Sequence, residues 1–128
     1  MVARPQRHAV RRPGKRTTIR LPRRLKEDMM HKMIEDDYGL RGKSRWICEA
    51  IEQLLDRPQW SDEMLADYAL KGDDVDVVTL TPEVVKIIND AIPIAIQEYP
   101  NLKGGAQSAI IRTAINARVM ALGELNFH

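Results

Sequence analysis

The sequence predicts a mainly α-helical fold with a two-stranded antiparallel ribbon, in the order strand-helix-helix, linker, strand-helix-helix. Two short segments alternate polar and apolar residues as half-buried strands do, each ends before a proline, and each precedes two stretches with helical periodicity. A lone strand cannot satisfy its backbone hydrogen bonds. We therefore expect the two strands to pair with each other within one chain, with residues near Ile19 lying beside residues near Val78.

Charge sets the start of the chain apart from the rest. Nine of the 20 Lys and Arg residues, and none of the 18 acidic residues, lie in residues 1–24, so the remaining residues carry a net charge of −7. Residues 1–14 contain Pro5, Pro13 and Gly14 among these charges and are predicted to form a flexible arm. A basic arm on an acidic body is typical of nucleic-acid-binding proteins.

The first predicted repeat spans residues 15–56. Its strand alternates two faces, with Arg16, Thr18 and Arg20 on the polar one. Pro22 ends this strand and suits the first turn of a helix that extends to about Asp37. A second helix is expected from Lys43 or Ser44 to Leu55, with Ser44 as its N-cap.

The second predicted repeat spans residues 75–122, after a helical connector of residues 57–74 and before a tail of residues 123–128. Thr81 is a suitable N-cap for its first helix, and Pro93 is expected to kink or split that helix. Ser108, near the start of the last helix, corresponds to Ser44.

At this point the sequence resembles the ribbon-helix-helix family of DNA-binding proteins. The resemblance rests on Thr17-Thr18-Ile19-Arg20-Leu21-Pro22 and Gly42-Lys43-Ser44-Arg45, and covers residues 16–55 well. It is weaker over residues 76–122, where the strand has no basic residue. The resemblance implies a ribbon in the major groove of DNA and helix starts against phosphates. The tandem arrangement implies an intramolecular pseudo-dimer, similar to some relaxosome accessory proteins of conjugative plasmids.

The family pattern assigns two sets of DNA-contacting residues. Arginine can bind guanine through two hydrogen bonds, whereas threonine and valine can contact a thymine methyl group. The base-reading positions are Arg16, Thr18, Arg20, Val77 and Thr79. The phosphate-binding positions are Arg11, Arg12, Lys15, Lys43, Ser44, Arg45, Gln107 and Ser108.

The second strand leaves two interpretations open. It presents Val75, Val77 and Thr79 where the first strand has arginine and threonine, so hydrogen-bonded base readout is nearly absent from it. Either the protein reads a lopsided, non-palindromic site, or the second half mainly completes the ribbon and recruits further subunits.

The predicted function is sequence-selective binding of double-stranded DNA without enzymatic activity, as a transcriptional regulator. The alternatives are a relaxosome accessory protein at a conjugative transfer origin and a protein-interaction module whose second half binds a protein partner, such as a relaxase or coupling protein, or another copy of itself. No paired carboxylates, glycine-rich phosphate loop or Cys/His cluster indicates catalysis, a metal or a cofactor. The single cysteine, Cys48, fits a reducing cytoplasm, and no apolar run approaches the roughly 18 residues of a membrane span.

Overall fold

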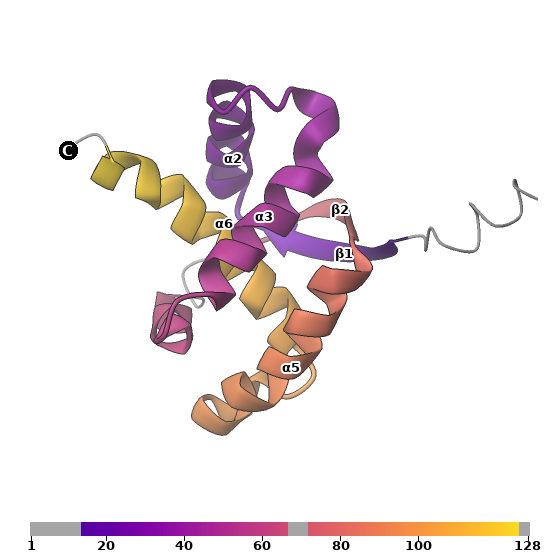
Figure 1. Cartoon of the computed structure of the whole chain (residues 1–128), viewed down its shortest axis with the longest axis vertical. Helices are drawn as coiled ribbons and strands as arrows, with labels where there is room; N and C mark the ends of the chain where they lie inside the picture. Colours follow the sequence, from indigo (N-terminus) through magenta and orange to yellow (C-terminus); the bar gives the residue numbers. More distant parts are fainter. Residues whose placement is uncertain (1–13, 67–71, 126–128) are drawn as a thin grey trace, which may run out of the picture.

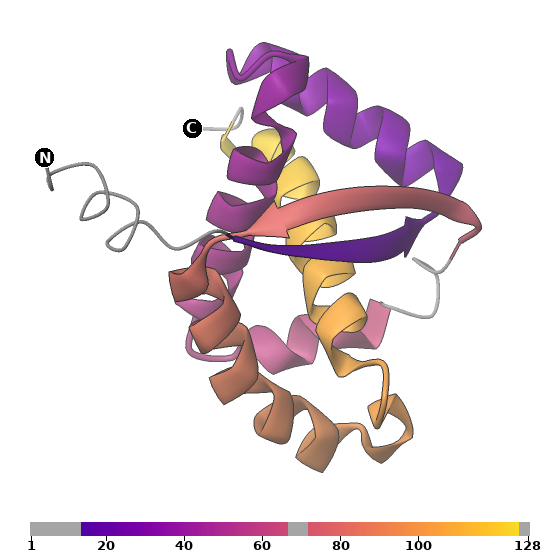
Figure 2. The same cartoon turned by 90° about the vertical axis from the view of Figure 1, so that its right-hand side faces the viewer.

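The structure is a computed structural model that describes residues 14–66 and 72–125. A two-stranded ribbon crosses one side of a group of helices, and the last helix passes behind it (Figures 1 and 2). In chain order the elements are β1 (Lys15–Leu21), α2 (Arg23–Glu35), the 3-10 turn η1 (Leu40–Gly42), α3 (Lys43–Leu55), the 3-10 segment η2 (Trp60–Ala66), β2 (Asp74–Leu80), α5 (Pro82–Glu98), the 3-10 turn η3 (Pro100–Leu102) and α6 (Ala106–Leu125).

The predicted pairing of the two strands is confirmed. β1 and β2 are antiparallel, with Thr17 opposite Val78 and Ile19 opposite Asp76. Glycines stand just before each strand because the chain passes very close to the other strand there. A Cβ atom at Gly14 would lie 2.5 Å from the Leu80 carbonyl oxygen, and one at Gly72 would lie 2.4 Å from the Pro22 nitrogen.

The helices begin and end for identifiable local reasons. The prediction for α5 is confirmed, since the Thr81 hydroxyl accepts a hydrogen bond of 3.2 Å from the Val84 amide and Pro82 occupies the first turn. The prediction of Ser44 as an N-cap is wrong, because Gly42 holds the N-cap position of α3 and makes no side-chain cap.

Pro93 does not split α5, which continues from Pro82 to Glu98. Both Pro93 and Asn89, whose carbonyl loses its helical donor at the proline, are exposed. Water can therefore hydrate that carbonyl, and the helix tolerates the proline.

A single apolar core lies between the inner face of the ribbon and the helices. α6 is central to this core, since it contacts α2, α3, α5, β1 and η2. Its first ten residues are buried on nearly every side because neighbours surround it. The largest fully buried side chains are Trp46, Ile19, Leu21, Met29, Met33, Ile47, Ile51, Leu54, Leu80, Ile88, Ile110 and Ile111.

The predicted tandem ribbon-helix-helix pseudo-dimer is wrong for the chain as a whole. The described residues contain one ribbon and one strand-helix-helix unit, β1-α2-α3, to which a second strand and additional helices are joined. These helices do not copy the first unit: α5 has 17 residues and α6 has 20, whereas α2 and α3 have 13 each. The short matching motifs specified the type of each local element, but not an equivalent tertiary arrangement of the two halves.

Every helix in residues 14–66 and 72–125 is too short or too polar to cross a lipid bilayer.

Candidate nucleic-acid interface

The outer face of the ribbon brings all the predicted base-reading residues together. The strand register places Arg16 opposite Thr79, Thr18 opposite Val77 and Arg20 opposite Val75. Because side chains alternate between faces, these three cross-strand pairs share the face directed away from the core. Val77 is partly buried, and the other five side chains are exposed.

The start of α3 is fixed directly to the ribbon. The backbone amide of Thr79 donates a hydrogen bond of 2.9 Å to the Ser44 hydroxyl. Ser44 therefore attaches the helix to the strand and does not cap the helix. The first amides of α3 lie beside the ribbon without a side-chain cap, where a phosphate could accept their hydrogen bonds.

The Lys43 side chain contacts the core side of the ribbon. Its ammonium group donates to a carboxylate oxygen of Asp76, whose side chain is only 9% exposed. The same carboxylate oxygen accepts a hydrogen bond of 2.8 Å from the Val77 amide. A buried carboxylate needs such partners, so Lys43 compensates charge inside the protein. Its role as a phosphate ligand stays a prediction, and the ammonium group is engaged on the core side of the ribbon.

Gln107 and Ser108 lie in the first turn of α6. The Gln107 side-chain amide donates a hydrogen bond of 3.0 Å to the Thr17 hydroxyl on the core face of β1. Ser108 is half-buried. Gln107 therefore links α6 to the ribbon, and this contact was not predicted from the sequence.

The other predicted phosphate ligands fall into two groups. Lys15 is exposed on β1, and Arg45 is 76% exposed and lies 3.3 Å from the Glu49 carboxylate. Arg11 and Arg12 lie outside the described residues. Lys15 and Arg45 are therefore the predicted phosphate ligands that the described chain presents to solvent as cations.

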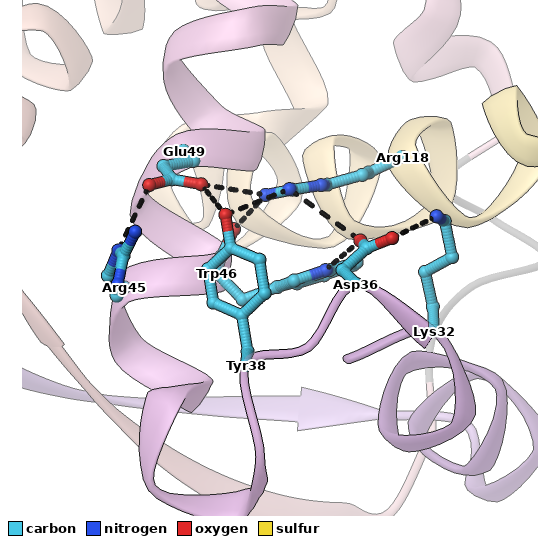
Figure 3. Close-up of polar contacts among 7 residues, drawn as sticks. All are labelled: Lys32, Asp36, Tyr38, Arg45, Trp46, Glu49 and Arg118. Atoms are coloured by element: carbon cyan, nitrogen blue, oxygen red, sulfur yellow. Dashed lines mark hydrogen bonds and ion pairs between the residues drawn. The ribbon is translucent and has the colours of Figure 1, made fainter. Parts of the chain in front are cut away.

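A cluster around Arg118 holds α3 in place relative to α2 and α6 (Figure 3). The Arg118 guanidinium donates a hydrogen bond of 2.8 Å to the Trp46 carbonyl and lies 3.6 Å from Asp36 and 3.5 Å from Glu49. It also stacks 4.7 Å from the centre of the Trp46 ring. The Tyr38 hydroxyl donates to Glu49, which completes the cluster.

The two carboxylates of this Arg118 cluster are stabilised in their charged form. Partial burial would raise the pKa of Asp36, but hydrogen bonds from Lys32 and Trp46 and the charge of Arg118 hold that pKa below its usual value. Partial burial likewise opposes ionisation of Glu49. Hydrogen bonds from Tyr38 and Arg45, with the charge of Arg118, outweigh it and lower the Glu49 pKa.

The sequence interpretation missed the Arg118 cluster and the Lys43–Asp76 pair. Arg118 lies one helical turn after the last buried residues of α6. Asp76 lies on the apolar face of its strand. A charge at such a position indicates a buried ion pair, and this signal was present in the sequence.

Two chemical features of the described residues bear on catalysis. Burial raises the pKa of the Cys48 thiol, which disfavours the reactive thiolate. Within residues 14–66 and 72–125, no three His, Cys, Asp or Glu side chains are grouped as a metal site would require.

No protein-family model, curated protein or solved structure matches this chain.

Proposed function

We propose that the chain binds double-stranded DNA sequence-selectively, with the outer face of the ribbon in the major groove. The observation that carries this proposal is the set of three cross-strand pairs on that face, which includes Arg16 and Arg20. A two-stranded ribbon fits the width of the major groove, and arginine is the commonest specific partner of guanine. The resemblance of residues 16–55 to the ribbon-helix-helix family supports the same surface.

Phosphate contacts would come from groups beside the ribbon. The uncapped start of α3, together with exposed Lys15 and Arg45, offers amides and positive charge at the edge of the proposed interface. The arginines of residues 1–13 would add sequence-independent affinity. Val75, Val77 and Thr79 offer little hydrogen bonding, so we expect a lopsided site with its guanines on the half that β1 reads.

Arg20 provides the sharpest test. Replacing Arg20 with alanine should relax the base preference at one position and weaken specific binding by roughly 1–3 kcal/mol, with a smaller loss on random DNA. The matched control is Arg23→Ala, since Arg23 is equally exposed but lies on α2 outside the ribbon. Selection of bound sequences from a random DNA pool, followed by titration of the selected site, measures both effects.

The result would contradict the proposal if Arg20→Ala and Arg23→Ala reduced specific and random binding equally. Failure of the selection to enrich any site would contradict it as well.

A regulator of transcription and an accessory protein at a transfer origin would use this same surface. We favour the regulator, which is the commoner role of a small DNA-binding protein. The single cysteine suits a reducing compartment such as the cytoplasm, where either role would be carried out. Mapping the selected site to promoters or to a transfer origin distinguishes the two roles.

A further inference from the structure

An open groove with a volume of about 710 Å³ lies between α3 and α5. Its lining combines apolar and acidic side chains. The apolar part consists of Leu55, Trp60, Ile87, Ala91 and Ile94. The acidic part consists of Glu49, Glu52, Asp56 and Asp90.

Glu49 is compensated by Arg45 and Arg118, whereas the other three acidic residues of the groove have little internal compensation. Glu52 and Asp56 are exposed, and no cation in residues 14–66 and 72–125 pairs with either. Asp90 pairs only with Lys86 at 3.3 Å, and both side chains are largely exposed, so this pair is weak. Among the described residues that line the groove, none is basic. The groove therefore suits a cationic segment that also carries apolar side chains.

The groove continues toward the point where residues 1–13 join the described chain. A smaller hollow of about 350 Å³ shares Glu49 and Glu52 with the groove and is also lined by Thr79, Thr81 and Arg45, which pairs with Glu49. Leu80 lies between those two threonines. A Cβ atom at Gly14 would lie only 2.5 Å from the Leu80 carbonyl oxygen and 2.6 Å from the Thr79 methyl group, so Gly14 lies near the residues that line this hollow.

Residues 1–13 have the matching chemistry and sufficient length. They contain Arg4, Arg7, Arg11 and Arg12, no acidic residue, and the apolar residues Val2 and Val10. Thirteen extended residues can span about 40 Å. From its N-cap Thr81 to Ile94, α5 rises only about 20 Å at 1.5 Å per residue.

We propose that the acidic groove between α3 and α5 binds the chain's own basic segment, residues 1–13. The arginines pair with Glu52, Asp56 and Asp90, and the apolar residues of the segment contact the apolar side chains that line the groove. One consequence rests on the proposed function. The groove and DNA phosphates would compete for residues 1–13, so that only DNA that also fits the ribbon would draw the whole segment out of the groove. The docking itself requires no DNA.

Nuclear magnetic resonance on the full-length chain without DNA tests the docking. The variant Arg4→Gln/Arg7→Gln/Arg11→Gln/Arg12→Gln changes only residues outside the described fold. At low salt we expect it to shift the amide signals of Glu52, Asp56 and Asp90 and the indole signal of Trp60 relative to the unsubstituted chain. High salt screens exposed charge pairs, so the two spectra should converge there.

Two further variants make the test specific to the groove. In a Glu52→Gln/Asp56→Asn background, neutralising the arginines should no longer shift the signals of Asp90 and Trp60. In a matched Glu27→Gln/Asp28→Asn background, which removes two exposed acids from α2, the shifts should persist. Unchanged groove signals upon arginine neutralisation would overturn the proposal. Shifts that disappear on dilution would overturn it too, because they would indicate the segment of a second copy.

Because no DNA enters this experiment, failure of the proposed DNA binding would leave its result intact.

Discussion

The Lys43–Asp76 pair gives Lys43 a structural contact that the sequence interpretation did not include. Lys43 belongs to a motif that the family resemblance associates with phosphate, yet its side chain neutralises a buried carboxylate from 33 residues away in the chain. The pair connects the start of α3 to β2. Its main effect is therefore expected on stability.

We expect Lys43→Met to lower the free energy of unfolding by about 3 kcal/mol, because it leaves the Asp76 carboxylate buried and unpaired. The double variant Lys43→Met/Asp76→Val removes both charges and should recover most of that loss. Urea denaturation of the four chains in this mutant cycle measures the coupling. If the double variant were no more stable than Lys43→Met, Lys43 would act through some contact other than Asp76.

Arg118 is a second residue whose importance lies in its surroundings. Arg118→Met keeps the aliphatic part of the side chain but removes the hydrogen bond to the Trp46 carbonyl and the charge beside Asp36 and Glu49. We expect a loss of about 2 kcal/mol in the free energy of unfolding, measured in urea at neutral pH. The control Arg45→Met removes a largely exposed partner of Glu49 and should cost at most about 0.5 kcal/mol.

The effect of Arg118 should depend on pH. Asp36 and Glu49 have lowered pKa values in the folded protein. Their contribution to stability is therefore present above the usual carboxyl pKa and is lost as the pH falls through their pKa values in the folded protein. The difference in free energy of unfolding between the original chain and Arg118→Met should therefore become smaller as the pH falls from about 5 to about 3. A difference that stayed constant or grew on acidification would show that Arg118 stabilises the fold through its contacts with Trp46 and not through the two carboxylates.

At the scale of elements, the ribbon depends on a close backbone approach at Gly72. A Cβ atom there would lie 2.4 Å from the backbone of Pro22, which cannot move without shifting the junction between β1 and α2. We expect Gly72→Ala to destabilise the protein by about 2 kcal/mol, as measured by thermal or urea unfolding. Gly105→Ala is the control, because a Cβ there meets nothing closer than 3.9 Å.

The control should cost at most about 1 kcal/mol, the usual range for a change at a helix start. Equal losses for Gly72→Ala and Gly105→Ala would argue against a steric cause at the ribbon.

At the scale of the whole molecule, charge is segregated between the basic N-terminal residues and the acidic body. If residues 1–13 contact DNA phosphates, Arg11→Gln/Arg12→Gln should weaken binding to all sequences and reduce the slope of log affinity against log salt by about 2. The matched control is Arg57→Gln, which removes an exposed arginine at the end of α3 distant from the ribbon. Titrations over a range of salt concentrations measure the slope, and an unchanged slope would exclude these two arginines from the interface.

Much of the candidate interface could be predicted before any coordinates. The alternation of β1 places Arg16, Thr18 and Arg20 on one face, and the structure confirms that Val77 and Thr79 lie opposite this set. The side-chain contacts of the helix residues that we expected to bind phosphate were harder to predict. Lys43 and Gln107 both contact the core side of the ribbon, because which side chains meet there depends on how α3 and α6 pack.

The sequence by itself determined the local elements: two alternating strands, the prolines and the Thr81 cap that begin helices, and the charge of residues 1–24. These features depend on neighbours a few residues apart, which the order of amino acids specifies directly. Only the tertiary structure decided that the two halves are not equivalent, that α6 occupies the centre, and that Arg118 joins α2 to α3. Such contacts join residues as far apart as Trp46 and Arg118, 72 positions in the chain, and are selected by the packing of the whole core.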